Sequence, residues 1–201
     1  MYRLFYNHQA IKDVLIVVIE PEARVLKSEA HNNVVALYGE DNKLVGYNIF
    51  HIDDVMKIKA NGVIFVPDSK LLEVVNSLLE RESLAPLPEV KDSGYRVAKV
   101  LSTEEHPLDE KALILKLQCG DKTYETVSSL KGIKEGSMVV VALDGTILYD
   151  GNMYHAAVIK NINNDVKVLS PVELRLEGSE KDAFLLDEDP SFKDGEDFFV
   201  R

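Results

Sequence analysis

The side chains best suited to acid–base or metal chemistry are five histidines, and they are scattered along the 201-residue chain. None lies at a metal-ligand spacing from another histidine or from Cys119, the single cysteine, so we expect no metal and no cofactor. In His51-Ile52-Asp53-Asp54 a histidine precedes two carboxylates, and such a pair can act as a general base. A surface loop with two acids explains the same residues, and we favour that interpretation.

A second chemical possibility is nucleophilic catalysis at Ser128-Ser129, where two hydroxyls lie close in sequence to the cation of Lys131. A serine nucleophile needs a base to activate it, and the sequence offers no identifiable one. The Gly-x-Ser-x-Gly, Gly-x-Gly-x-x-Gly and phosphate-binding P-loop motifs are also absent. We therefore predict no catalytic residue and expect that the chain is not an enzyme.

Residue types that bind RNA are found after position 93. Proteins hold RNA single strands and loops by aromatic stacking, by cations along the backbone, and by hydroxyl or main-chain donors. The tyrosines in this part are Tyr95, Tyr124, Tyr149 and Tyr154, and the lysines near predicted turns are Lys111, Lys131, Lys134 and Lys160. A strand tyrosine usually packs inside and a loop lysine is usually solvated, so these residues alone leave the function open.

The net charge of −11 argues against a general nucleic-acid binder, because phosphate contacts depend on lysine and arginine. The charge is unevenly distributed, however. Residues 1–92 carry 10 basic and 14 acidic side chains, residues 93–176 carry 10 and 11, and residues 177–201 carry 3 and 9. The middle part is therefore nearly neutral and can still present a local basic face. We expect the acidic tail to be a solvated end, or to screen that face from unwanted polyanions.

The first 90 residues predict an α+β domain. A helix is expected after Pro67, capped by Asp68 or Ser69, with leucines and valines on one face. Pro86 and Pro88 end this region and mark a linker, so we place the domain boundary near residue 90. The predicted strands are Arg3–Asn7, Asp13–Glu20, Arg24–Ser28, Val34–Glu40 and Lys43–Phe50, the last two joined as a hairpin.

Residues 91–201 predict a second domain of five short strands with glycine turns. Gly120-Asp121 is expected to form a tight hairpin, and Ser170-Pro171-Val172-Glu173 has the pattern of a capping box that begins a short helix. The pattern fits a five-stranded Greek-key OB-fold barrel, and it fits a β-sandwich nearly as well. The predicted strands are Tyr95–Leu101, Ala112–Gln118, Lys122–Ser128, Ser137–Leu143 and a fifth within Ala156–Leu169.

The chain has no pattern that would direct it to a membrane or for secretion. Its apolar runs are far shorter than the roughly 20 residues that span a bilayer. Met1–Asn7 has no signal-peptide pattern, and a single cysteine suits a reducing compartment. We expect a cytoplasmic protein that does not bind membranes.

The second domain resembles the tRNA-binding-domain family, an OB-fold module of free-standing tRNA-binding proteins and of some aminoacyl-tRNA synthetases. The residues that carry this resemblance are His106-Pro107-x-x-x-Lys111, Gly120, Thr123, Val127, Gly136, Val139-Val140-Val141-Ala142, Gly145 and Gly151. Phe5-Tyr6-Asn7 and Val45–Phe50 resemble the extra N-terminal domain of the YtpR-type proteins of Gram-positive bacteria. The sequence departs from the family at Ser128-Ser129, where the family has Cys-Gly.

The resemblance implies an OB barrel that binds tRNA by shape, without catalysis, and it allows a homodimer. The residues that we predict as backbone or hydroxyl contacts to RNA are Lys111, Ser128, Ser129, Lys131, Lys134 and Lys160. The alternative is a protein-interaction or assembly module on an OB scaffold that has lost RNA binding. The net charge of −11 and the absence of some family glycines favour this alternative.

Overall fold

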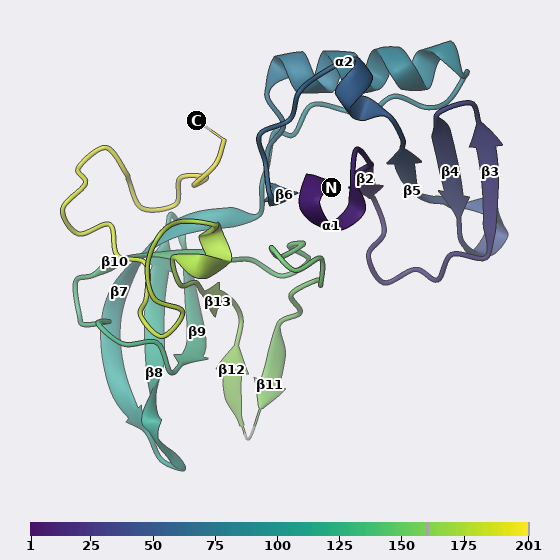
Figure 1. Ribbon diagram of the computed structural model, residues 1–201. Helices are drawn as coiled ribbons and strands as arrows, with labels where there is room; N and C mark the ends of the chain where they lie inside the picture. Colours follow the sequence, from purple (N-terminus) through teal and green to yellow (C-terminus); the bar gives the residue numbers. More distant parts are fainter. Residues whose placement is uncertain (160, 201) are drawn as a thin grey trace. The chain divides into compact units, whose positions relative to one another are not determined.

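A computed structural model, shown in Figure 1, describes residues 1–159 and 161–200. The chain divides into two compact units. The N-terminal unit comprises Met1–Lys91 and Asp150–Asn152, and the C-terminal unit comprises Asp92–Tyr149 and Met153–Arg201. Both are built mainly from β-strands, as the sequence predicts. Among the described residues, no helix has the length and apolar character needed to cross a membrane.

The N-terminal unit is a six-stranded antiparallel sheet in the order β3-β4-β5-β2-β1-β6, packed against helix α2 (Figure 1). Its elements are β1 (Arg3–Tyr6), α1 (His8–Ile11), β2 (Leu15–Val18), β3 (Lys27–His31), β4 (Val34–Tyr38), β5 (Leu44–Ile49), β6 (Gly62–Ile64) and α2 (Ser69–Arg81), with 3-10 turns at Glu40–Asn42 and Ile52–Asp54. Most of these elements lie where the sequence predicts them.

Helix α2 confirms the prediction of a capped amphipathic helix. The Asp68 carboxylate accepts a hydrogen bond from the Leu71 N–H at 2.8 Å, which satisfies one of the free donors of the first turn. Leu71, Val75 and Leu79 are buried and belong to the same core as the inner face of the sheet. Burial of this stripe fixes the helix against the sheet.

Two strands of the N-terminal unit differ from the prediction. The strand expected at Arg24–Ser28 lies at Lys27–His31 instead, because β3 is an edge strand. Its place is set by backbone pairing with β4 rather than by the apolar side chains of Val25 and Leu26, which are exposed. Strand β6, only three residues long, is too short for the sequence pattern to reveal.

The C-terminal unit contains a five-stranded antiparallel sheet in the order β13-β10-β7-β8-β9 and a separate hairpin, β11–β12. Its strands are β7 (Tyr95–His106), β8 (Asp109–Cys119), β9 (Lys122–Ser128), β10 (Met138–Ala142), β11 (Ala157–Ile159), β12 (Ile162–Asn164) and β13 (Lys167–Val168). The fifth predicted strand, within Ala156–Leu169, is therefore three short strands.

The two edges of this sheet approach each other. Strand β9 lies at one edge, and the residues that lead into β13 at the other edge hydrogen-bond to it. The Asp165 N–H donates to the Glu125 carbonyl at 2.9 Å, and the Val127 N–H donates to Asn164 Oδ1 at 3.1 Å. A sheet that closes in this way is barrel-like, with an inside packed by side chains. Val100, Leu115 and Val139 are among the buried core residues.

The acidic tail folds back on the sheet. The Val97 N–H donates to the Glu196 carbonyl at 2.9 Å, and the Leu186 N–H donates to the Met138 carbonyl at 2.8 Å. These bonds join the tail to β7 and β10. The tail is thus part of the fold, whereas the sequence suggested a solvated end.

The predicted capping box is present, but the helix that it begins is short. The Ser170 N–H and hydroxyl both donate to Glu173 Oε2, at 2.9 and 3.0 Å. The helical part is one 3-10 turn, Val172–Leu174, because Arg175 takes a left-handed conformation with φ 60°. The predicted short C-terminal helix is therefore a single turn.

Candidate nucleic-acid interface

The register of β8 and β9 brings four of the predicted contact residues to the same end of this strand pair. Leu113 is opposite Ser128, so Lys111 lies just before that pair on β8 and Ser129 just after it. Lys131 follows in the loop that leaves β9. Residues that are close to one another only through strand pairing can therefore contact one ligand.

Three of the four predicted lysines are exposed and lie within the described residues. Lys111, Lys131 and Lys134 are exposed, and their ammonium groups form no ion pair with the described residues. Cations that are not already paired can neutralise phosphates at little desolvation cost. Lys160, which was also predicted, lies outside the described residues.

Ser128 and Ser129 line a cleft of about 420 Å³ at the end of β9. The Ser128 hydroxyl is buried and accepts a hydrogen bond from the Leu130 N–H at 3.2 Å, so it has a structural task. Ser129 is exposed. Of the two predicted hydroxyls, that of Ser129 is the one that is accessible to a ligand.

One wall of the cleft comes from the residues around the capping box. Lys167 forms an ion pair with Glu173 Oε1 at 2.6 Å, and the other oxygen of Glu173 is held by Ser170. The charge of Lys167 is therefore already neutralised. Because both oxygens of Glu173 have partners, this wall is rigid and close to neutral.

Another part of the cleft comes from the tail. Lys181 and Glu180 line the cleft. The Lys131 N–H donates to the Lys181 carbonyl at 2.8 Å, and the Ala183 N–H donates to the Lys131 carbonyl at 2.9 Å. Two backbone hydrogen bonds thus fix the tail beside a residue predicted to contact RNA.

The tyrosines named in the sequence are mostly structural. Tyr95 is fully buried, and its hydroxyl donates to the Ile147 carbonyl at 3.1 Å. Tyr124 packs against the barrel core, and the Tyr154 hydroxyl donates to the Asn164 carbonyl at 2.8 Å. Burial raises the pKa of Tyr154 to about 12. Tyr149 is the one of the four that lines the cleft.

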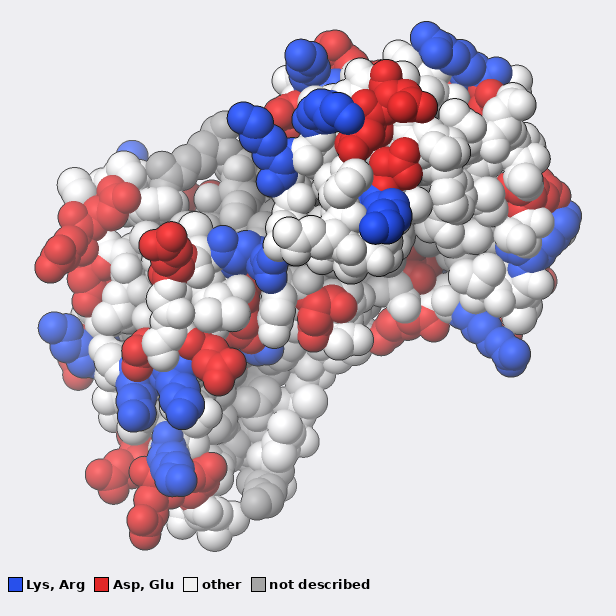
Figure 2. Space-filling model, viewed as in Figure 1, with Lys and Arg blue, Asp and Glu red and all other residues white. Residues whose placement is uncertain are grey.

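Charge is mixed over the C-terminal unit. On its visible face, at the lower left of Figure 2, lysine and arginine side chains lie among acidic ones and do not form a single stripe. On the outer side of the sheet, Lys116 of β8 is directly opposite Glu125 of β9. Such a face gives only modest long-range attraction for a polyanion, so any RNA contact must be local.

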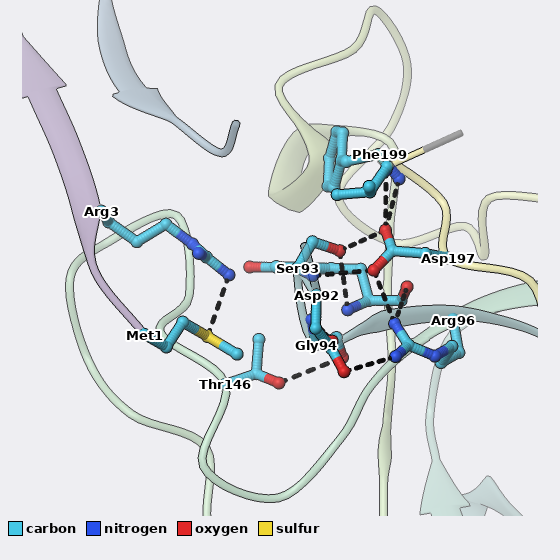
Figure 3. Close-up of polar contacts among 11 residues, drawn as sticks. Met1, Arg3, Asp92, Ser93, Gly94, Arg96, Thr146, Asp197 and Phe199 are labelled. Atoms are coloured by element: carbon cyan, nitrogen blue, oxygen red, sulfur yellow. Dashed lines mark hydrogen bonds and ion pairs between the residues drawn. The ribbon is translucent and has the colours of Figure 1, made fainter. Parts of the chain in front are cut away.

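Several acids of the tail are bound within the fold. The Asp197 carboxylate accepts hydrogen bonds from the Ser93 N–H at 2.7 Å and hydroxyl at 2.6 Å, and pairs with Arg96 at 2.7 Å (Figure 3). Burial alone would raise the pKa of Asp197, but these hydrogen bonds outweigh it and the pKa is lowered. Asp187 and Asp194 likewise accept from the N–H groups of the sheet strands or their turns.

Two hairpins of the C-terminal unit expose apolar side chains. Leu108, between β7 and β8, is 70% exposed, and Val158 of β11 is 69% exposed. Ile159 is exposed as well. Both hairpins project toward the bottom of Figure 1. A contiguous exposed apolar patch marks an interaction surface, and Val158 and Ile159 are neighbours in the sequence.

The histidine and acids at positions 51–54 do not form a general-base pair. His51 Nδ1 lies 3.2 Å from Asp13, whereas Asp53 accepts a hydrogen bond from the Tyr6 hydroxyl at 2.8 Å and pairs with His8 at 3.2 Å. The surface-loop interpretation therefore holds for these residues. The described residues contain no group of histidine, cysteine, aspartate or glutamate that could hold a metal ion.

Comparison with known proteins finds relatives of this chain. The chain is 27% identical over 175 residues to "Putative tRNA-binding protein YtpR" of Bacillus subtilis, which covers 86% of this chain and 87% of the relative. The chain resembles the tRNA-binding-domain family. This confirms the resemblance inferred from its motifs. A family described as a domain of unknown function, DUF4479, matches residues 21–87.

Shorter matches lie in synthetase subunits. The chain is 30% identical over 80 residues to the phenylalanine–tRNA ligase beta subunit of Thermotoga maritima, covering 40% of this chain and 10% of the subunit. The chain is 36% identical over 70 residues to the same subunit of Desulfotalea psychrophila, and this match covers 35% of this chain and 8% of the subunit. The chain thus spans a tenth or less of these subunits. The solved structure of a MetRS related protein from Pyrococcus horikoshii has a TM-score of 0.37 at 13% identity, covering 50% of this chain and 84% of that one.

Of the residues predicted as RNA contacts, Ser128 and Ser129 line the cleft, and the prediction did not include the other lining residues. Lys181 and Glu180 lie in the acidic tail, which we expected to be solvated. Tyr149 was named for stacking together with the other three tyrosines. The turn signal Asp150-Gly151 directly after Tyr149 is the one feature that marks it as a surface position.

Proposed function

We propose that the chain is a cytoplasmic, non-enzymatic RNA-binding protein that binds tRNA by shape through an OB-type barrel. The observation that carries this proposal is the similarity to a relative named as a tRNA-binding protein, because it extends over 86% of this chain. The matches in two phenylalanine–tRNA ligase beta subunits support the same ligand.

The strand arrangement supports an OB-type barrel. The order β13-β10-β7-β8-β9, with β9 bonded to the residues before β13, supports a five-stranded Greek key. OB folds bind oligonucleotides on their second and third strands and on the loops after the first and fourth. Here those strands are β8 and β9, and the loops carry Leu108 and the β11–β12 hairpin.

The proposed contact residues are the ones at the end of the β8–β9 pair and in the adjoining loops. They are Lys111, Ser128, Ser129, Lys131, Lys134 and Lys160. A few unpaired lysines on a nearly neutral barrel give an interaction that is short-ranged and sensitive to salt. This fits recognition by shape, in which the protein contacts phosphates and sugars rather than base edges.

A filter-binding titration of the full chain with bulk tRNA at several salt concentrations tests the proposal. We expect binding at low salt, with a log–log salt slope of roughly −0.7 to −0.9 for each phosphate neutralised. In the triple variant Lys111→Gln, Lys131→Gln, Lys134→Gln, the number of neutralised phosphates calculated from the slope should fall by about three. Lys122→Gln, at the opposite end of the β8–β9 pair, is the matched control and should leave the slope unchanged.

The possible results separate the function from its site. Failure to retain tRNA even at low salt would refute the function. Retention with an unchanged slope in the triple variant would preserve the function and remove these lysines from the interface.

A second candidate function is protein interaction or self-assembly, including a homodimer. It is favoured by the exposed apolar side chains of Leu108, Val158 and Ile159. Sedimentation or light scattering after nuclease treatment measures the mass directly. A dimer that Val158→Asp converts to a monomer supports this function, whereas a monomeric wild-type chain contradicts the homodimer.

A further inference from the structure

The cleft at the end of β9 has the size of a small-ligand site. Its volume of about 420 Å³ lies within the range of roughly 300–1,000 Å³ that is usual for such sites. All of its lining residues belong to the C-terminal unit, and most come from three separate segments, β9 with its following loop, the residues around Glu173, and the tail.

The lining suits a flat ring with polar edges. Val127, Leu130 and Val172 provide apolar surface, and Tyr149 provides an aromatic side chain. Tyr149 forms no ring contact or hydrogen bond with any other residue that the structure describes. An aromatic side chain that lines a cleft can be a stacking platform for a base, and every base has a π-face to offer it.

The charges of the cleft suit one phosphate and not a longer stretch of backbone. Lys167 is neutralised by Glu173 at 2.6 Å. Lys181 forms no ion pair within the described part of the chain, so it is the cation that remains for a ligand. The exposed hydroxyl of Ser129 and the carboxylate of Glu180 add one donor and one acceptor, which can meet the polar edge of a base.

The walls are held in place before any ligand arrives. Lys131 is bonded through its backbone to residues 181 and 183, at 2.8 and 2.9 Å, and these bonds hold the backbone of Lys181 beside the loop that follows Ser129. A site that is already formed does not lose ordering entropy when it binds.

We infer that this cleft takes one unpaired nucleotide of the bound RNA, with its base against Tyr149 and its phosphate at Lys181. The inference rests on the proposed function and extends it, because shape recognition of the backbone alone needs no pocket for a base. It predicts that the chain favours RNAs with an unpaired nucleotide over continuous duplex.

The absence of tryptophan from the chain allows a direct test. Tyr149→Trp places a single tryptophan in the cleft and keeps an aromatic ring there. Bulk tRNA should quench its fluorescence, with the same midpoint as in the filter titration. A continuous RNA duplex of equal length should leave it unquenched. Phe50→Trp in the N-terminal unit is the control for quenching that is unrelated to the cleft.

Affinity measurements supply the second test. Tyr149→Ala should weaken binding of bulk tRNA by roughly 5- to 150-fold, the range expected when one base loses its stacking partner. Tyr149→Phe, which keeps the ring, should bind like the wild type. Lys181→Ala should reduce the salt slope by about one, whereas Lys193→Ala on the same tail should not.

Three results are distinguishable. Fluorescence quenching of the Tyr149→Trp variant by tRNA, together with weaker binding by Tyr149→Ala, supports the nucleotide site. Normal tRNA binding by a folded Tyr149→Ala, with no quenching of the Tyr149→Trp variant, overturns it and leaves the proposed function intact. No binding of tRNA by the wild-type chain overturns both.

Discussion

Replacing Asp197 by alanine removes the carboxylate that ties the acidic tail to the start of β7. Its two oxygens accept five hydrogen bonds at 2.6–2.9 Å, from the Ser93 N–H and hydroxyl, the Arg96 guanidinium, and the N–H groups of Phe199 and Val200. The side chain is only 11% exposed. Water therefore replaces these bonds poorly when the carboxylate is lost.

The loss in free energy of unfolding depends on how far Arg96 is left without a partner. Breaking a buried ion pair by removing one partner costs about 3–5 kcal/mol. Arg96 keeps a second partner, because Asp92 lies 2.8 Å from its other terminal nitrogen. Asp92 is 60% exposed, so that remaining pair contributes little. We expect Asp197→Ala to lower the free energy of unfolding of the C-terminal unit by about 3 kcal/mol, at the lower end of that range.

The pH dependence provides a sharper signature than the loss itself. The pKa of Asp197 is lowered in the folded chain, since the hydrogen bonds to its carboxylate outweigh the effect of burial. A carboxyl with a lowered folded pKa stabilises fully above its unfolded pKa of about 3.9 and loses this contribution as pH falls through the folded value. The difference between wild type and variant should be constant near neutral pH and should shrink in acid.

Urea unfolding followed by far-ultraviolet circular dichroism measures this difference, and hydrogen exchange locates it. The amides of Val97 and Phe198, which bond across the tail and β7, should exchange faster in the variant. Glu188→Ala is the control, because Glu188 is an exposed acid of the same tail with no hydrogen bond or ion pair to the described residues. A loss below about 1 kcal/mol, the usual value of one neutral hydrogen bond, would refute the reasoning. So would a difference that persists unchanged in acid.

Two further predictions concern backbone strain and a half-buried phenol. Gly94 has φ 78°, and a Cβ there would overlap Thr146 Oγ1, whereas Gly136 has φ 86° with no atom within 4 Å of a Cβ. Gly136→Ala should therefore cost only about 1–2 kcal/mol for its left-handed backbone, and thermal melting should show a clearly larger loss for Gly94→Ala; equal losses would contradict the packing argument. Burial raises the pKa of Tyr154 to about 12, so the stability that it contributes is complete below pH 10 and is lost as pH rises toward 12. The phenolate absorbance of the wild type and of Tyr154→Phe should be measured against pH, and the difference between the two should rise near pH 12. A difference that rises near pH 10 would show that Tyr154 is solvated.

Local signals predicted the parts of the fold whose causes are local. The Asp68 cap and the capping box at Ser170 depend on residues within one helical turn, and both are present. Strand β3 shows the opposite case. Its residues, Lys27–His31, are mostly polar and exposed, and they form a strand because β4 offers backbone partners. No side-chain pattern can report such pairing, and the neighbouring Val25-Leu26 drew the prediction toward the wrong residues.

The same distinction explains what was predicted of the cleft. Ser129 and Lys131 are adjacent to a predicted strand end and have suitable side chains, so the sequence predicts them as contact residues, and of the two Ser129 lines the cleft. Lys181 approaches them only because the tail folds back, through backbone bonds to Lys131. These bonds involve main-chain atoms alone. The side chain at position 181 does not determine these backbone hydrogen bonds. A sequence pattern therefore could not predict that Lys181 lies beside Lys131.

The tail also shows why net charge alone was a weak argument against RNA binding. A sum of charges treats each acid as a source of long-range repulsion for phosphate. Asp187, Asp194 and Asp197 instead accept hydrogen bonds from backbone N–H groups of the same unit, and Asp197 is further neutralised by Arg96. A carboxylate whose field is cancelled by donors a few ångströms away contributes little beyond the Debye length of about 8 Å. Lys111, Lys131, Lys134 and Lys181 are exposed and form no ion pair with the described residues, so these are the cations available to the proposed RNA contacts. Exposed acids lie beside some of them in the sequence, Glu110 next to Lys111 and Asp182 next to Lys181.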